Sequence, residues 1–151
     1  MSAGWTIRVA QPRDADAWCA LRSALWPEED VDAIVRETHA FSCSGRDALA
    51  LVAVDAAGVV IGFAEAKLRR DYVNGAATSP AGFLEGLYVV PARRRAGIGR
   101  ALVCAVEGWV RESGCRELAS DADLSNVAGH AAHRACGFAE TGRVVYFLKR
   151  V

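Results

Sequence analysis

The chain has 151 residues, of which 52% are hydrophobic and 24% are charged, with 18 lysines and arginines against 18 aspartates and glutamates. This length fits one domain whose core buries about 70% of the unfolded surface, so we expect residues 1–151 to form a single domain. The balanced charge and high apolar content exclude a disordered chain and a protein with broad affinity for nucleic acid. A charged partner is therefore expected to meet a local patch.

The cysteines indicate a reduced, intracellular setting. There are five of them, spread along the chain without a Cys-x-x-Cys pair or a histidine at metal-ligand spacing, so we expect no bound metal. The sequence shows no charged-then-apolar leader and no run of about 18 apolar residues, so we expect neither a signal peptide nor a membrane span. These features predict a cytoplasmic protein without a membrane or nucleic-acid partner.

The N-terminal part predicts a strand, two helices and a hairpin. Alternation over residues 5–9 indicates the first strand, and Asp14 offers an N-cap for a helix that runs to about Leu25. A second helix keeps apolar residues at helical spacing over 31–38. Two apolar runs around the short turn AAG predict a β-hairpin over 48–68.

The C-terminal part continues the mixed α/β order. Residues 69–82 carry Asn-Gly and Ser-Pro breakers and no periodicity, which predicts a loop that is a candidate substrate lid. A helix begins at Ile98, keeps a clean apolar stripe and ends before Gly114. The other expected elements are a strand over 83–90, a strand over 115–120, a helix over 126–136 and one or two strands within 138–151.

A basic turn with two glycines, PARRRAGIGRAL at 91–102, joins the strand 83–90 to the following helix. The start of a helix presents unpaired backbone N–H groups and the positive end of the helix dipole, which together favour an anion. Gly97 and Gly99 remove the Cβ atoms that would keep an oxygen away from these amides. Bidentate attraction to phosphate would come from Arg93, Arg94, Arg95 and Arg100. The pattern therefore predicts a phosphate-binding turn.

Other interpretations of this turn fit less well. A P-loop is excluded because no Gly-x-x-x-x-Gly-Lys-Ser/Thr string occurs. A dinucleotide-binding turn needs a small residue where Leu102 stands, although Asp121 imitates the acid that binds the ribose. A solvated cap on a core helix needs neither four arginines nor two glycines at one place.

Two motifs resemble those of the GCN5-related N-acetyltransferase (GNAT) superfamily. VVPARRRAGIGRAL is similar to its acetyl-CoA motif, with Arg94, Gly97 and Gly99 on the marked positions, and NVAGHAAHRACGF is similar to its second motif. The resemblance implies a GNAT fold, with a mostly antiparallel mixed sheet of about six to seven strands and about four helices. It also implies that strands 83–90 and 116–121 splay apart and hold the pantetheine arm of acetyl-CoA between them.

The residues that this resemblance assigns to acetyl-CoA lie in the turn, at the end of the strand before it and in the last helix. They are Tyr88, Val89, Val90, Arg94, Arg95, Ala96, Gly97, Ile98, Gly99, Arg100, Asn126 and His133. The backbone amides of Tyr88 and Val89 are the implied donors to the oxyanion of acyl transfer.

Acyl transfer to an amine needs a base for the amine and an acid for the departing thiolate. Glu85 is the candidate base, because a carboxylate in the middle of FLEGLYVV is out of place unless it faces a wet cleft. The acid stays open between His133, which stands where most of the superfamily has tyrosine, and Tyr146. Either side chain could instead be a packing residue. No cysteine or serine has a recognisable nucleophile setting, which favours direct attack by the amine.

The strings LWPEED, RRDYVNG, SPAGFLEG and CRELASD resemble the aminoglycoside 6'-N-acetyltransferases over nearly the whole chain. This resemblance implies transfer of acetyl to the 6'-amine of an aminoglycoside, antibiotic resistance, and a homodimer with the final strand as its edge. A polycationic substrate should meet carboxylates and aromatic faces. The candidate substrate-binding residues are Trp26, Asp71, Tyr72, Glu85, Asp121 and Glu140.

Two other functions stay open at this point. The same fold could act on another amine, such as a protein N-terminus, a lysine or a polyamine, and would then show a shallower groove with fewer acids. The chain could also be a CoA-binding or dimerising module without chemistry. Single candidates have structural alternatives as well: Trp26 could close the end of its helix, Asp71 could be a solvated loop acid, and Asp121 could cap a turn.

Overall fold

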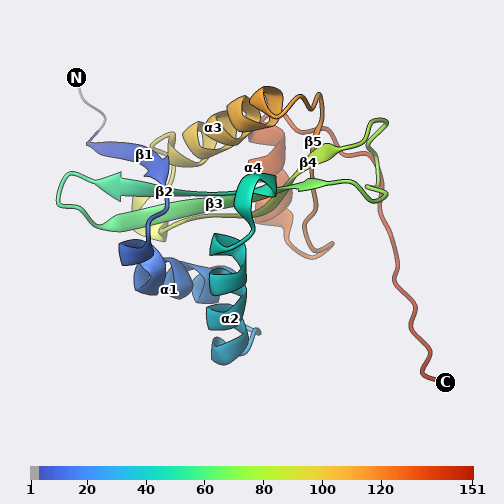
Figure 1. The fold of residues 1–151 in the computed structure, drawn as a ribbon, viewed down its shortest axis with the longest axis horizontal. Coiled ribbons are helices and arrows are strands. Elements are labelled where there is room, and N and C mark those ends of the chain that lie inside the picture. Colours follow the sequence, from blue (N-terminus) through green and yellow to red (C-terminus); the bar gives the residue numbers. More distant parts are fainter. Residues whose placement is uncertain (1–3) are drawn as a thin grey trace.

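The computed structural model describes residues 4–151, which form a five-stranded sheet in the order β1-β2-β3-β4-β5 with helices around it (Figure 1). The strands are β1 Trp5–Val9, β2 Ala48–Asp55, β3 Val60–Arg69, β4 Ala81–Val89 and β5 Leu118–Ser120. The helices are α1 Ala15–Leu25, α2 Val31–Ser42, α3 Ile98–Glu112 and α4 Val127–Ala135. β1 to β4 pair antiparallel and β5 runs parallel to β4, which confirms the predicted mixed, mostly antiparallel sheet.

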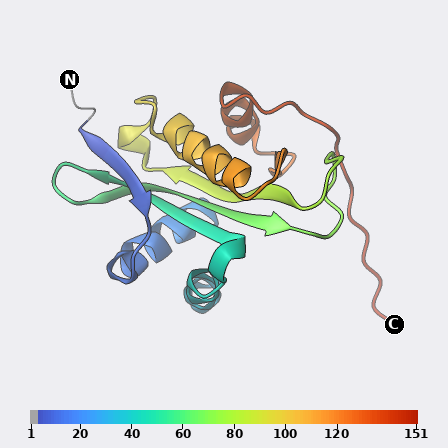
Figure 2. The same cartoon turned by 45° about the horizontal axis from the view of Figure 1, so that its top comes forward.

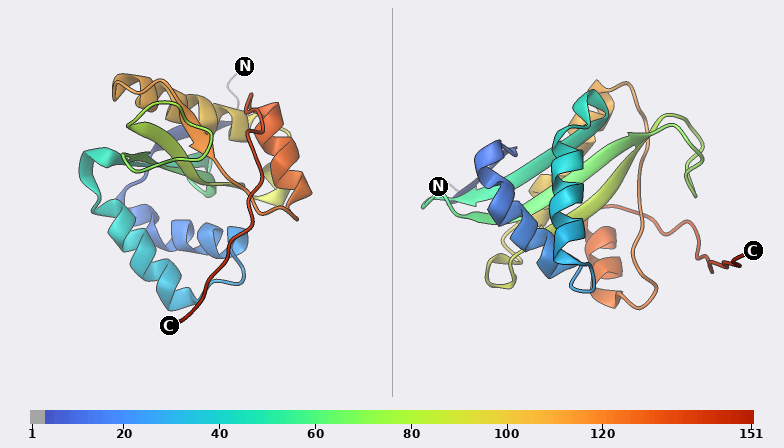
Figure 3. Two further views of the ribbon diagram at one scale, coloured as in Figure 1. Left: turned by 90° about the vertical axis from the view of Figure 1, so that its right-hand side faces the viewer. Right: turned by 60° about the horizontal axis from the view of Figure 1, so that its bottom comes forward.

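Helices cover both faces of the sheet: α1 and α2 lie on one side, and α3 and α4 on the other (Figures 2 and 3). Because side chains alternate along a strand, each face has its own core. Phe63 of β3 packs in a cluster with Trp18 and Phe41 under α1 and α2. Its neighbour Ala64 belongs to a second cluster that includes Leu102 of α3.

The central helix α3 follows its predicted stripe. Its buried residues are Ile98, Leu102, Val103, Val106 and Val110, and burying each such side chain contributes about 1.5–3 kcal/mol. Gly114, with φ of 80°, takes the left-handed conformation just after the helix ends.

The sheet has five strands in the described residues, fewer than the six to seven expected. The predicted strand 115–120 is paired only over β5, and residues 138–151 contain neither helix nor strand. Residues 139–151, hereafter the C-terminal arm, first pass along the body, where Glu140 pairs with Arg134 and Thr141 lies beside Gly75, and then extend away from it (Figure 1). The prediction of closing strands is wrong for the single chain, because a strand needs a neighbour for its backbone hydrogen bonds.

Residues 4–151 show neither a candidate membrane span nor a candidate metal centre. No helix in this range is long and apolar enough to cross a membrane. The same residues contain no group of three or more His, Cys, Asp or Glu side chains that could hold a metal ion.

Candidate active site

A β-bulge in β4 places Glu85. Glu65 of β3 lies opposite Gly86, whereas the next residue of β3 lies opposite Leu84, so Glu85 is an extra residue on β4. Bulges are frequent beside active sites because they re-aim a side chain. Here Glu85 lines a cavity together with Trp26, and a Cβ added to Gly86 would lie 2.8 Å from Trp26 Cη2. Both residues of the bulge therefore face the layer of α1 and α2.

The pairing between β4 and β5 stops at this bulge. It covers three residue pairs and ends with Leu84 opposite Ser120, and Glu85 is the next residue of β4. From Glu85 to Val89 the β4 backbone has no partner on β5 in the described chain. The two strands therefore part from Glu85 onward, and the resemblance implied a splay at Tyr88 and Val89, three to four residues further along β4.

The glycine turn follows at the end of β4. Gly97, the N-cap of α3, has φ of 84°, and a Cβ added there would meet no atom within 4 Å. Arg95 also takes a left-handed conformation, with φ of 63°. Arg94 Nε donates to Val89 O over 2.8 Å, and its guanidinium carbon lies 5.2 Å from the centre of the Tyr88 ring. The turn is therefore open to solvent at the start of α3 and tied back to β4 by one arginine.

A cavity of about 440 Å³ lies between β3, β4 and the two helices α1 and α2. Its lining carries four carboxylates and two cationic side chains, together with two aromatic rings. The lining residues are Arg22, Trp26, Glu29, Glu37, Ala40, Phe41, Glu65, Lys67 and Glu85. The excess of acids over bases makes this cavity suited to a positively charged ligand.

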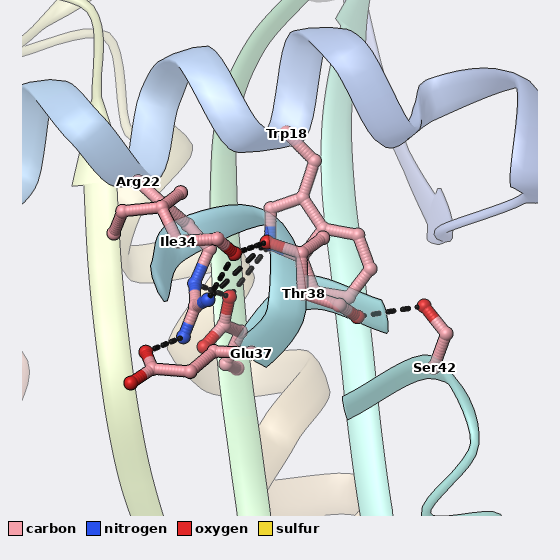
Figure 4. Close-up of polar contacts among 7 residues, drawn as sticks. Trp18, Arg22, Ile34, Glu37, Thr38 and Ser42 are labelled. Atoms are coloured by element: carbon pink, nitrogen blue, oxygen red, sulfur yellow. Dashed lines mark hydrogen bonds and ion pairs between the residues drawn. The ribbon is translucent and has the colours of Figure 1, made fainter. Parts of the chain in front are cut away.

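Glu65 and Arg22 form the floor of the cavity. Arg22 Nε lies 2.8 Å from Glu65 Oε1, and Trp18 Nε1 donates to the same oxygen over 2.6 Å. Burial raises the pKa of Glu65, and the charge of Arg22 and the Trp18 hydrogen bond act against that rise. Figure 4 shows Arg22 held by α2 as well, since Nη1 donates to Ile34 O over 3.3 Å and to Thr38 Oγ1 over 3.2 Å. Glu65 Oε2 is buried without a hydrogen-bond partner among the described residues.

Arg69 and Glu85 form a second ion pair at the rim. Arg69 Nη2 lies 2.9 Å from Glu85 Oε1 and 2.8 Å from Oε2, and Nε lies 3.0 Å from Oε1. The guanidinium carbon also lies 3.5 Å from the centre of the Phe83 ring. The candidate base is therefore already neutralised by a neighbouring side chain.

His133 approaches the splay from the opposite side of the sheet. Its Nδ1 lies 2.7 Å from Gly129 O, and because a carbonyl only accepts, Nδ1 carries the hydrogen. Its Nε2 lies 2.8 Å from Ser120 Oγ, which is also 3.2 Å from Leu84 O at the last β4–β5 pair. The Ser120 hydroxyl thus connects the His133 imidazole to the point where β4 and β5 separate.

This arrangement of splayed strands and a glycine turn agrees with the comparison of the chain with known families. The sequence model of the acetyltransferase (GNAT) family matches residues 15–138. The chain belongs to the GNAT family. This membership confirms the predicted GNAT fold. It also confirms the predictions that the protein is an N-acetyltransferase and that its co-substrate is acetyl-CoA.

Several GNAT relatives are similar along nearly their whole length. The aminoglycoside N(6')-acetyltransferase type 1 of Stenotrophomonas maltophilia is 54% identical over 142 residues, 94% of this chain and 91% of the relative. The structure of the aminoglycoside antibiotic 6'-N-acetyltransferase AAC(6')-Ih from Acinetobacter baumannii has a TM-score of 0.92 at 42% identity, covering 98% of this chain and 99% of the other. AAC(6')-Iy in complex with a bisubstrate analogue of CoA and acetylneamine has a TM-score of 0.90 at 38% identity, covering 97% and 99%.

The GNAT fold brings some predicted residues together. Trp26 and Glu85 line one cavity. Asn126 caps α4, where its Oδ1 accepts from Gly129 N over 2.9 Å. The predicted cofactor residues from Tyr88 to Arg100 form a continuous segment from the end of β4 to the first turn of α3.

Other predicted substrate residues do not line the cavity. Asp71 and Tyr72 lie exposed between β3 and β4, and Asp121 is exposed just after β5. Glu140 accepts from Arg134 over 3.3 Å and from Arg143 over 2.5 Å. Tyr146 lies on the C-terminal arm and is 82% exposed. The roles of these residues stay predictions.

Sequence reasoning missed most of the cavity's charged residues. They are Arg22, Glu29, Glu37, Glu65 and Lys67, and the rim cation Arg69 was missed too. One signal was present, because Glu65 interrupts the apolar strand VIGFAEAKL in the same way that Glu85 interrupts FLEGLYVV. The others lie on a helix, in the turn between α1 and α2 or near a strand end, where a charge is ordinary.

Proposed function

We propose that this GNAT enzyme transfers the acetyl group of acetyl-CoA directly to the 6'-amine of an aminoglycoside, and that it confers resistance to such antibiotics. The observation that carries the proposal is the acid-lined cavity, which meets the splay of β4 and β5 at Glu85. Relatives of 54% and 42% identity that bear the name of this activity support it.

Acetyl-CoA is proposed to bind on the α3 side. Its phosphates meet the amides at the start of α3 and the arginines of the turn, because a helix N-terminus with nearby guanidinium groups is a ready anion site. The pantetheine arm enters the gap beyond Ser120, and the backbone amides of Tyr88 and Val89 stabilise the oxyanion. Asn126 stands at the start of α4.

The aminoglycoside is proposed to bind on the opposite side, in the cavity. Several ammonium groups on one ligand match several carboxylates, and the Trp26 ring offers an apolar face to a sugar or a cation. A simple alkylamine or a protein N-terminus carries one such group, whereas the cavity offers the accessible carboxylates Glu29, Glu37 and Glu85. The charge of the cavity therefore favours a polycation over an amine with a single positive charge.

Glu85 is the proposed base. It takes a proton from the 6'-ammonium, and the freed nitrogen lone pair attacks the thioester carbonyl. Collapse of the tetrahedral intermediate keeps the new C–N bond and breaks the C–S bond. The nitrogen releases its second proton to solvent and the thiolate takes up a proton from the acid, which leaves the amide and free CoA. His133 and Tyr146 stay the two candidates for this acid. The contact of His133 with Ser120 at the splay favours His133.

We also propose that the chain, one domain over 1–151, works as a cytoplasmic homodimer. The C-terminal arm exposes Val145, Tyr146, Phe147 and Leu148, each at least 76% accessible. A second copy of the chain is the proposed cover for these side chains, because so much apolar surface on one segment is costly in water. Sedimentation of the full chain and of a chain ending at residue 138 tests this, and two monomers would contradict it.

The deciding experiment measures thiol release from acetyl-CoA with two aminoglycosides that differ only in a 6'-amine or a 6'-hydroxyl. Release with the amine alone is the expected result. Release with both would mean that another amine is the target, and release with neither would overturn the substrate. Glu85→Gln should lower kcat by about 10²–10⁴-fold, whereas the exposed acid Glu112, replaced by Gln, should leave it unchanged.

A further inference from the structure

Arg69 stands where the cationic substrate would meet Glu85. We propose that Arg69 is a resident counter-ion of Glu85, which the 6'-ammonium group of the substrate must displace before the amine can react. The proposal rests on the proposed function and adds to it a residue that sets the affinity for the reacting group. Arg69 is the last residue of β3 and is outside the set predicted from the sequence.

The two cations compete for the same acceptor. Arg69 satisfies both oxygens of Glu85 through three short N···O contacts, the longest of them 3.0 Å. An ammonium group seeks the same charge-assisted hydrogen bonds. The face of Phe83 supports the guanidinium from the side, so the free protein holds Arg69 in one defined position.

In the free protein Arg69 occupies both oxygens of Glu85, so neither oxygen is free to accept a hydrogen bond or a proton from the amine. A proton that arrives from the amine would neutralise the carboxylate and so remove the attraction to the guanidinium. Displacement of Arg69 frees one oxygen and puts the reacting nitrogen beside it. The N–H proton then passes to that oxygen, and the lone pair left on nitrogen forms the bond to the acetyl carbon.

Arg69 is able to leave this position. Its side chain is 40% exposed and that of Glu85 is 22% exposed, so water solvates the guanidinium as it moves. Arg69 also precedes the irregular segment 70–80, which contains no strand pairing that its movement would break. Arg22 of the floor, at 6% exposure, has no such path.

The competition predicts a specific effect of Arg69→Gln. The dissociation constant of the 6'-amine drug, measured by calorimetry without acetyl-CoA, should fall by about three- to fivefold, the range of a half-exposed ion pair. The matched 6'-hydroxyl drug brings no cation to Glu85, so its dissociation constant should stay within about twofold. Arg69→Lys keeps the charge without the bidentate geometry. Its dissociation constant for the 6'-amine drug should lie between those of the wild type and Arg69→Gln.

Arg70→Gln is the matched control, because Arg70 is the next residue and its own pairing, with Asp47 at 3.4 Å, lies on the surface. It should change neither dissociation constant, and thermal unfolding of all variants checks the fold. Tighter binding of the 6'-amine drug by Arg69→Gln supports the role of Arg69, whether or not the wild type releases thiol. An absence of thiol release from the wild type would overturn only the proposed function. An unchanged or weaker affinity for the amine, or an equal gain for the hydroxyl drug, would overturn the role of Arg69.

Discussion

Two guanidinium–carboxylate pairs lie on the same face of the sheet, Arg22 with Glu65 and Arg69 with Glu85, and each has an N···O distance of 2.8 Å. They differ in burial. The side chains of the first pair are 6% and 1% exposed, and those of the second are 40% and 22% exposed. The same two functional groups therefore form a fixed floor at one place and an exchangeable contact at the other.

Solvent explains this difference. A buried charge that loses its partner keeps the full cost of desolvation, so Arg22 and Glu65 must stay together. An exposed charge that loses its partner is rehydrated and screened by salt, so Arg69 is free to exchange. Burial, rather than distance, decides which ion pair supports the fold and which is available to a ligand.

The largest expected effect is on stability and separates the two pairs directly. Arg22→Ala should lower the free energy of unfolding by about 3–5 kcal/mol, because it leaves Glu65 buried and unpaired. Arg69→Ala should lower it by less than about 1 kcal/mol. Urea unfolding of the two variants measures both values. Similar losses for both would contradict the distinction, and a double variant with Arg22→Met and Glu65→Leu should recover most of the first loss.

A medium effect is expected at Gly86, which lies between the two pairs. Its Cβ would lie 2.8 Å from Trp26 Cη2, so Gly86→Ala should overpack the cavity wall and cost about 1–3 kcal/mol. Gly108 in α3 is the matched control, because a Cβ there meets no atom within 4 Å. Gly108→Ala should stabilise the helix by up to about 1 kcal/mol. Chemical denaturation gives both numbers, and a neutral Gly86→Ala would show that Trp26 is free to move.

The smallest effect concerns a third pair of intermediate burial, Arg8 with Asp14 at 2.7 Å, whose side chains are 28% and 5% exposed. The hydrogen bond from Arg8 holds the pKa of Asp14 below its ordinary value. The unfolded chain therefore takes up the proton more readily than the folded one. The stability from this pair is complete above the ordinary pKa and is lost as the pH falls through the lower, folded-state pKa.

Asp14→Asn should accordingly cost about 1 kcal/mol at pH 7, and less as the pH falls below about 4. Melting curves between pH 7 and pH 3 check this, with Asp16→Asn on the exposed surface of α1 as the control. If the difference in melting temperature between the wild type and Asp14→Asn does not change with pH, the Arg8–Asp14 pair does not contribute to the loss of stability in acid.

The sequence predicted the local features of this molecule well, because neighbouring residues determine them. The turn at Gly97 and the stripe of α3 are patterns within about fifteen residues, and the structure confirms the turn and most of the stripe, with Ala105 exposed and Val103 buried instead. Glu85 was found because a carboxylate interrupts an apolar strand. The bulge that aims it depends on the register with β3, which is set by two strands together and is not visible in either one.

The sequence pattern did not predict ion pairs between residues that are far apart in the chain. Arg22 and Glu65 lie in different elements, 43 positions apart by the difference of their numbers, and only the packing of α1 on β3 brings them together. Asp14 shows the same difficulty in a smaller way. It stands at the predicted N-cap position of α1, but its carboxylate accepts from Arg8 Nη1 and from Gln11 N, over 2.7 Å each, and makes no hydrogen bond to the first turn of the helix. The C-terminal arm has the composition of a strand, but composition does not supply the neighbouring strand that it needs.

The division of the cavity into a floor and a rim has a consequence for the evolution of its ligand range. Glu29, in the turn between α1 and α2, and Glu37, on α2, are both exposed, and a substitution at an exposed position usually changes stability by no more than about 0.5 kcal/mol. Lineages can therefore exchange these positions one at a time and sample new ligands without passing through unfolded intermediates. The floor offers no such freedom, so variation in this enzyme should accumulate around the mouth of the cavity.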